Sequence, residues 1–174
     1  MAIITLDYFN EYTGDQNADE DAVALKTDLI DTAQSIIEQW LGYPLAATDY
    51  VFDERAIYKK YIKLIAPAIS VTVVKIDDLE TSEYTINSRK EYIFFDEIVQ
   101  DREVYVEYSG GLSVIPAAMK IVCCKIASLL LMETNKQIGV TGVSMSDGMS
   151  HQYVSYTNYA KHLKPLSKWR ILPI

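Results

Sequence analysis

The chain has 174 residues and a formal net charge of −8, with 49% apolar and 23% charged residues. This composition is ordinary for a globular domain and indicates neither a disordered chain nor a membrane-embedded one. The acidic balance disfavours a surface that grips nucleic acid, because affinity for phosphate backbones comes from clustered Lys and Arg. A chain of this length is expected to form one domain that can bury a substantial core.

A long helix is predicted over residues 18–41. Its apolar residues share about half of a helical wheel, while polar and acidic residues take the other half. The acids at 19–21 suit the positive end of the helix dipole, and Gly42 marks the end of the helix. The same acids could instead form a metal or partner site, but capping explains them. The preceding residues, 1–16, are expected to pack loosely.

A β-rich insertion is predicted over residues 45–108, because the helical period disappears there and β-branched and aromatic residues take over. We expect an antiparallel sheet of about four strands. Alternation places Val104, Val106 and Tyr108 on one face of it. The strands stand between helices and do not alternate with them, so the predicted class is α+β. The segments expected as strands are 61–65, 71–76, 84–87 and 92–95 as a hairpin, and 104–108.

A central helix is predicted over residues 116–134. Pro116 suits a first helical position, and Gly110 and Gly111 let the chain reverse before it. One dense apolar arc, with Val122 and Ile126 at its centre, is expected to face the core. The opposite side mixes apolar residues with lysines, so the helix has no clearly polar face that would be exposed to solvent. The apolar residues there are therefore expected to contact another subunit or a partner: Ile121, Cys124, Leu131 and Met132.

The loop and C-terminal tail, residues 137–174, are expected to be loosely packed in the free subunit and to become ordered on docking. The loop is rich in Gly and Ser, and the tail, which includes a predicted C-terminal helix, concentrates basic residues. The alternative is a tail folded back against the first helix, which would bury Leu163, Leu166 and Ile171. The residues expected to dock on an acidic partner are Tyr153, Tyr156, Tyr159, Lys161, Lys164, Lys168, Trp169 and Arg170.

The sequence contains few candidate catalytic residues. His151 and His162 are not at ligand spacing from each other or from a cysteine, and no G-x-S-x-G element is present. Asp77 and Asp78 lie where a strand ends and are interpreted as turn acids. The two adjacent cysteines are expected to be reduced core residues. We therefore expect no enzymatic activity, no cofactor and no metal.

The order of these elements resembles a known family. The helix DEDAVALKTDLIDTAQSIIEQWLGYP, the strand pair IKLIAPAISVTVVKID, the segment VEYSGG, the helix IPAAMKIVCCKIASLLLMETN and a Ser/Gly loop leading to VSY follow one another over roughly residues 17–172. This succession resembles the head-tail connector proteins of tailed bacteriophages and prophages, also called head completion or adaptor proteins. The resemblance implies a single connector-like domain over residues 1–174, a helical body with a β-rich insertion.

The resemblance also implies a function. Such a protein is expected to form a homo-oligomeric ring, usually a dodecamer, beneath the portal protein, where it extends the DNA channel and provides a platform for tail attachment. Its expected partners are itself, the portal and a neck stopper or tail completion protein, while DNA passes without specific binding. It would be made and assembled in the bacterial host cytoplasm and reside in the virion neck. The rival expectation is a soluble binding or regulatory module, monomeric or a small oligomer, without catalytic activity.

Overall fold

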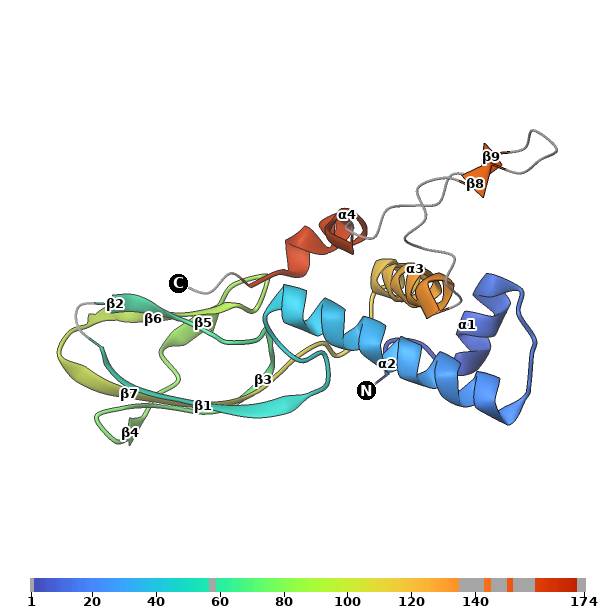
Figure 1. Ribbon diagram of the computed structural model, residues 1–174. Coiled ribbons are helices and arrows are strands. Elements are labelled where there is room, and N and C mark those ends of the chain that lie inside the picture. The colour runs from blue at the N-terminus through green and yellow to red at the C-terminus, as the bar shows by residue number, and fades with distance from the viewer. Residues whose placement is uncertain (1, 57–58, 135–142, 145–149, 152–158, 172–174) are drawn as a thin grey trace. The chain divides into compact units, whose positions relative to one another are not determined.

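The computed structural model describes residues 2–56, 59–134, 143–144, 150–151 and 159–171. They form two compact units, each assembled from separate stretches of the chain (Figure 1). The helical unit contains residues 2–40 and the described residues from 116 to 169, and the β unit contains residues 41–115 and 170–171. Helices and antiparallel sheets are both present, so the predicted α+β class is confirmed. A single connector-like domain over the whole chain stays a prediction.

The long predicted helix is present as α2, Glu20–Leu41. Its buried residues recur at helical spacing, with Ile30, Ala33 and Ile37 at 4%, 0% and 0% exposure. The backbone carbonyl of Asp19 accepts the first hydrogen bond, from the Val23 amide at 2.9 Å. The acids of this segment therefore lie in the first turn, where they complement the helix dipole.

The chain before α2 forms a second helix, α1, Leu6–Thr13, which the sequence reasoning missed by expecting a loose lead. Thr5 caps it, because its hydroxyl oxygen accepts a hydrogen bond from the Tyr8 amide at 3.3 Å. Gly14 ends it in the left-handed conformation, φ 71°. Phe9 is fully buried at 0% exposure and anchors the helix. Capping at both ends and one buried aromatic thus compensate for the short length.

Lys26 fastens the connection between α1 and α2. It is only 2% exposed, although it is charged. Its ammonium group donates to Asn10 Oδ1 and the Asn17 carbonyl, both at 3.2 Å, and to the Asp15 carbonyl at 3.4 Å. It also lies 3.0 Å from the Asp15 carboxylate. A buried ammonium with this many oxygen partners is satisfied, so the residue is structural.

The central helix is present as α3, Ala117–Thr134. Pro116 precedes it, and its carbonyl accepts the amides of Met119 and Lys120 at 2.9 and 3.3 Å, so the proline is a cap and not a first helical residue. The Cys123 thiol donates weakly to the Ile30 carbonyl of α2 at 4.0 Å, which joins the two helices. The buried residues of α3 are Met119, Val122, Cys123, Cys124, Ile126 and Ala127.

The β unit consists of two antiparallel sheets, where about four strands in one sheet were expected. The predicted hairpin is confirmed, since β5 pairs with β6 from Tyr84 opposite Phe95 to Ile86 opposite Ile93. The strand over 48–56 was missed. The strands of the four-stranded sheet are, in spatial order, β1 (Thr48–Ala56), β7 (Arg102–Gly110), β3 (Ala68–Ile76) and β4 (Leu79–Glu80). Those of the three-stranded sheet are β2 (Lys59–Lys63), β6 (Tyr92–Val99) and β5 (Tyr84–Ile86).

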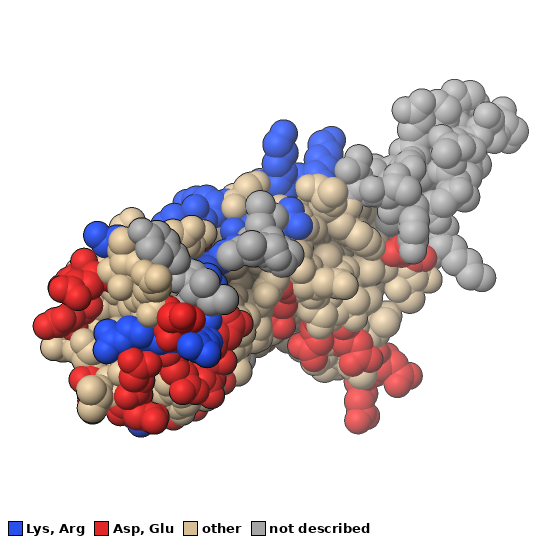
Figure 2. All heavy atoms as spheres, turned by 90° about the vertical axis from the view of Figure 1, so that its left-hand side faces the viewer, with Lys and Arg blue, Asp and Glu red and all other residues tan. Residues whose placement is uncertain are grey.

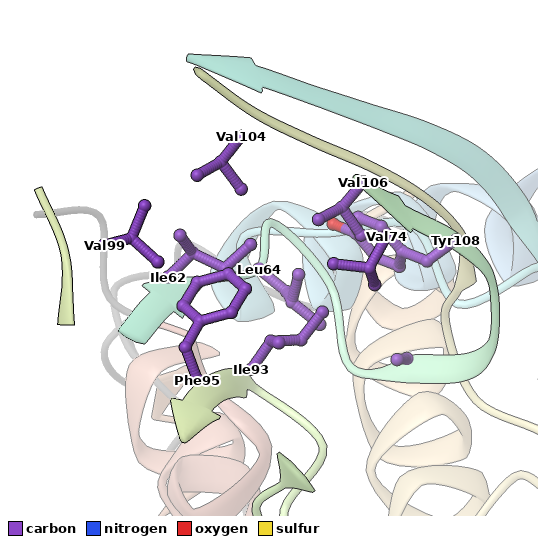
Figure 3. Close-up of a cluster of buried hydrophobic side chains, with 10 residues drawn as sticks. Ile62, Leu64, Val74, Ile93, Phe95, Val99, Val104, Val106 and Tyr108 are labelled. Carbon is purple, nitrogen blue, oxygen red and sulfur yellow. The ribbon is translucent and has the colours of Figure 1, made fainter. Parts of the chain in front are cut away.

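The core of the β unit lies between the two sheets (Figure 3). Val104, Val106 and Tyr108 point inward from β7 with exposures of 0%, 0% and 2%, as the alternation predicted. Ile93 and Phe95 of β6 meet them from the other sheet. Burial of each such side chain contributes about 1.5–3 kcal/mol to the free energy of unfolding, so packing between the two sheets stabilises the β unit. The Tyr108 hydroxyl also accepts the Ile65 amide at 2.9 Å.

The described part of the tail is folded, which corrects the expectation of loose packing there. The helix α4, Tyr159–Leu163, is followed by the 3₁₀ helix η1, Lys164–Trp169. Leu163, Leu166 and Ile171 are 4%, 0% and 8% exposed. The Ile171 amide donates to the Leu41 carbonyl at the end of α2, at 3.0 Å. The burial of these three residues, which the folded-back alternative predicted, is therefore confirmed, while α4 and η1 pack against α3 and the bond to the first long helix lies at its very end. The loop contains the paired two-residue strands β8, Val143–Ser144, and β9, Ser150–His151.

Candidate assembly surfaces

The outer side of α3 exposes part of the predicted contact surface. Ile121 and Met132 are 42% and 48% exposed, and Leu131 is partly buried. Cys124 is different, because it is 0% exposed and belongs to the core of its own chain. We therefore remove it from the contact surface. On the helical wheel Cys124 lies between the exposed Ile121 and the buried Ala127, so packing against neighbouring helices decides its burial. Burial raises the pKa of the Cys123 and Cys124 thiols to about 12 and about 11.

Two tyrosines of α1 extend this exposed surface, and the sequence reasoning missed both. Tyr8 and Tyr12 are 37% and 45% exposed and lie one turn apart, so they share a helix face. The Lys120 ammonium lies 5.8 Å from the centre of the Tyr8 ring, which places α1 beside the start of α3. Ile121 follows Lys120 in the chain. The helical unit thus presents apolar and aromatic groups from two helices.

The tail presents its basic residues to solvent. Lys161, Lys164 and Lys168 are exposed on α4 and η1, and Arg170 is exposed just after them. The Lys168 ammonium lies 4.1 Å from the centre of the partly buried Trp169 ring. Tyr159 donates its hydroxyl hydrogen to Glu133 of α3 at 3.2 Å. Two residues of the predicted docking set, Tyr153 and Tyr156, lie outside the described residues.

The outer face of the four-stranded sheet is rich in acids. Asp49, Asp53, Glu103 and Glu107 lie on it together with Tyr105, as the strand register shows. In Figure 2, which views the end of the β unit, acidic side chains predominate toward the bottom, the side of this sheet. A pocket of about 230 Å³ opens among Asp53, Lys75, Asp78, Glu103 and Tyr105.

One end of the β unit carries ion pairs. The Arg102 Nε donates to Asp77 Oδ2 at 2.7 Å, and the Glu103 amide donates to Asp77 Oδ1 at 2.9 Å. Both bonds lower the pKa of the Asp77 carboxyl, and the bond from the Arg102 guanidinium has the larger effect. Asp77 and Asp78 have φ of 50° and 64° in the turn between β3 and β4, so their interpretation as turn acids is confirmed.

Among the described residues, no group of three His, Cys, Asp or Glu side chains could hold a metal ion. His162 lies in α4, and His151 is the last residue of β9. No described helix is long and apolar enough to cross a membrane. The described surface presents large exposed side chains on α1 and α3, basic residues on the tail and charged residues on the β unit.

The fold is that of proteins in the necks of virus-like particles. The chain is similar to a chain in the neck of an empty gene transfer agent particle computed with C6 symmetry, at 14% identity and a TM-score of 0.54, over 99% of this chain and 91% of that one. A chain in the virion of the native gene transfer agent particle matches at 12% identity and a TM-score of 0.55, over 99% of this chain and 91% of that one. A third chain, in the neck of the native particle computed with C12 symmetry, matches at 14% identity and a TM-score of 0.52, over 97% of this chain and 89% of that one.

The sequence itself identifies the family. Residues 2–164 match the head completion protein family, and the chain therefore belongs to it. It is a structural head-tail connector protein of bacteriophage type, located at the head-tail junction. The rival expectation, a soluble regulatory module, is not favoured by this membership. No curated protein matches the sequence.

Proposed function

We propose that the protein assembles into a closed ring, a dodecamer in the virion, beneath the portal protein. There it continues the DNA channel and provides the platform for a neck stopper or tail completion protein, and it acts without catalysis. The observation that carries this proposal is the family match over residues 2–164. The similar chains in particle necks computed with C6 and C12 symmetry support a ring of this order.

The contact surface of α3 supplies one side of the proposed interface between subunits. A closed ring requires heterologous contacts, in which one surface of a subunit meets a different surface of the next. Ile121, Leu131 and Met132 present apolar area on α3, and Tyr8 and Tyr12 extend it from α1. Large side chains of this kind are those that contribute most to protein interfaces.

The basic tail supplies the proposed contact with the portal. Lys161, Lys164, Lys168 and Arg170 are exposed and suit an acidic partner surface, with Trp169 and Tyr159 beside them as anchors. Because α4 and η1 are already folded, binding immobilises few additional residues and loses little chain entropy. Tyr153 and Tyr156 belong to the proposed docking set from the sequence alone.

The acidic balance suits a channel through which DNA slides. With a net charge of −8 the protein repels a polyanion on average, so DNA can pass without being held. The proposal therefore includes no specific contact between this chain and DNA.

Docking on purified portal rings tests the proposal. The wild-type protein should co-sediment with the rings and add a layer of density in negative-stain images. Lys164→Glu should weaken docking about tenfold, since it reverses a charge on the contact surface. Lys90→Glu is the matched control, because Lys90 is also exposed but lies in the turn between β5 and β6. A protein that does not associate with portal rings at all would refute the proposal.

A further inference from the structure

The outer face of the three-stranded sheet carries three aromatic rings. Tyr61 of β2 stands opposite Phe94 of β6 in the strand register. The next pair, Ile62 and Ile93, is 2% and 0% exposed and points into the core between the sheets (Figure 3). Because side chains alternate along a strand, Tyr61, Phe94 and Tyr92 point to the outer face. The shift in register between β2 and β6 lies outside this stretch, so the alternation holds here.

The three rings contact one another and form what we call the aromatic face. The ring centre of Tyr61 lies 5.6 Å from that of Tyr92 and 5.7 Å from that of Phe94. The centres of Tyr92 and Phe94 are 6.1 Å apart. Tyr61 and Phe94 are nevertheless 49% and 38% exposed. Rings that already hold one another lose little side-chain freedom on binding, so the aromatic face suits a protein contact.

One base and one small polar residue border the aromatic face. Lys63 of β2 stands opposite Tyr92 in the register and is partly buried. Thr85 of β5 stands opposite Phe94 and is exposed. Lys59 is not counted on this face, because the register shifts between it and the following stretch of β2. The aromatic face therefore carries positive charge at one border.

The surface formed by Tyr8, Tyr12, Ile121, Leu131 and Met132, which we call the helical surface, has matching chemistry. On α1 the exposed acids Asp7 and Glu11 lie one turn apart, in the row next to the two tyrosines. On the other side of the tyrosines Phe9 is buried, so the acids lie on the solvent side. Neither acid makes an ion pair with a described residue. The helical surface thus combines aromatic and apolar area with negative charge at its α1 border.

We infer that the aromatic face of one subunit binds the helical surface of the next, with Lys63 toward Asp7 and Glu11. The inference rests on the proposed ring and supplies what that ring still requires, a second surface different from the first. Charges of opposite sign on the two borders favour this pairing over the pairing of either surface with itself. The contact is heterologous and continues from copy to copy until the ring closes.

Removal of one ring tests whether the aromatic face takes part in assembly. Tyr61→Ala should raise the protein concentration for half-maximal ring assembly on purified portal rings by at least about tenfold, because large aromatic anchors contribute most to interfaces. Val51→Ala is the matched control and should leave this concentration unchanged. Val51 is 57% exposed in the middle of β1, on the other sheet. Thermal unfolding checks that both variants are folded.

Cross-linking tests which two surfaces meet. Thr85→Cys borders the aromatic face, and Lys125→Cys replaces an exposed residue one turn after Ile121 on α3. Both changes leave the aromatic and apolar side chains of the contact in place. A chain with both cysteines, docked on portal rings and treated with a short bismaleimide, should give a ladder of multimers, while each single variant should stay monomeric. Cys123 and Cys124 are 0% exposed, so they do not contribute background.

A mixture of two impaired chains tests the direction of the contact. One chain carries Ile121→Asp with Thr85→Cys, so its aromatic face is intact, and the other carries Tyr61→Ala with Lys125→Cys, so its helical surface is intact. This mixture retains one kind of contact and should give cross-linked dimers without a longer ladder. If the two cysteines are exchanged between the chains, both mark the impaired surfaces, and no dimer should form. An isologous contact cannot distinguish the two mixtures in this way.

The outcomes separate the hypotheses. A ladder from the double-cysteine chain, with dimers from the first mixture alone, supports the inference. Dimers from a single-cysteine variant indicate an isologous contact, and a cross-link within one chain places the two cysteines together without a partner; both overturn it. If rings form on the portal without a ladder and Tyr61→Ala is harmless, the inference fails while the proposed function stands. A Tyr61→Ala ring that is intact but no longer binds another neck protein assigns the face to that partner and also overturns the inference. Failure of the wild type to dock refutes the proposed function itself.

Discussion

Two glycines with positive φ allow backbone strain to be separated from steric clash. Gly111 has φ 132°, and a Cβ there would lie 2.7 Å from the Ala46 carbonyl oxygen and 3.0 Å from that of Leu45. Gly14 has φ 71°, and a Cβ there would meet nothing within 4 Å. Gly111→Ala therefore introduces strain and clash together, whereas Gly14→Ala introduces strain alone.

The magnitudes follow from these two situations. Gly14→Ala should lower the free energy of unfolding by about 1 kcal/mol, the strain of an L-residue in the left-handed region. Gly111→Ala adds overpacking against two backbone carbonyls, and the Leu45 carbonyl is also held by the Leu112 amide at 3.1 Å. Strain of about 1–3 kcal/mol and overpacking of a similar size give about 2–6 kcal/mol in total.

Urea unfolding of both variants, followed by far-UV circular dichroism against the wild type, measures the difference. The tyrosine signal in the near-UV follows the β unit in parallel, since β7 and β6 carry several of these residues. Equal losses in the two variants, or a loss below about 1 kcal/mol for Gly111→Ala, would refute the reasoning. The bend at Gly111 would then not be what directs the chain from β7 toward α3.

Four further predictions concern the helical unit, pH and DNA. Ile121→Asp should abolish assembly while lowering unfolding free energy by no more than about 2 kcal/mol, whereas Ile126→Asp, in the core, should lower it by more than about 4 kcal/mol in the same denaturation assay. Lys26→Met should cost about 1–3 kcal/mol, because the loop oxygens lose their shared donor, and should speed proteolysis between α1 and α2. Burial raises the pKa of Tyr43 to about 12, above the ordinary 10, so the contribution of the neutral Tyr43 side chain to the free energy of unfolding is complete below pH 10 and is lost as the pH rises toward 12. Tyr43→Phe should therefore flatten the dependence of stability on pH in that range of an alkaline unfolding titration. Fluorescence anisotropy should detect no appreciable binding of duplex DNA at physiological salt, and a steeply salt-dependent submicromolar affinity would contradict the passive channel.

The parts of the fold that the sequence predicted well are those with strong periodicity. The helix α2 has a clear apolar face, and the alternation around Val106 places β7 correctly. The missed elements have weaker patterns. The helix α1 is only eight residues long, and its two caps, at Thr5 and Gly14, were the signal that could have found it. The strand β1 reads TDYVFDERA, and its charged outer face conceals the inward alternation of Tyr50 and Phe52.

The surfaces were harder to predict than the elements. Cys124 and Ile121 both fall outside the dense apolar arc of α3, yet one is fully buried and the other exposed. Only the packing of neighbouring helices distinguishes them. Similarly, the tail was expected to become ordered only on docking, although Leu163 and Leu166 recur at the spacing of a single helical turn and are both buried. The division of the strands into two sheets depends on long-range pairing, which local periodicity does not report.

The insertion of the β unit between α2 and α3 also affects the order of folding. The contact between Cys123 and Ile30 joins residues 93 positions apart, and closing a flexible loop of that length costs about 4 kcal/mol of chain entropy. All strands of the β unit lie within residues 48–110, so the two sheets can form before α3 has left the ribosome. The hydrogen bond from the Leu112 amide to the Leu45 carbonyl then brings the ends of the insertion together. The loop that the contact between Cys123 and Ile30 still has to close is then about 26 residues long, so the entropic cost of closing it falls by about 1 kcal/mol. Until α3 is synthesised the apolar face of α2 has no partner from that helix, so a nascent chain stalled before Pro116 should recruit chaperones that recognise exposed apolar helices.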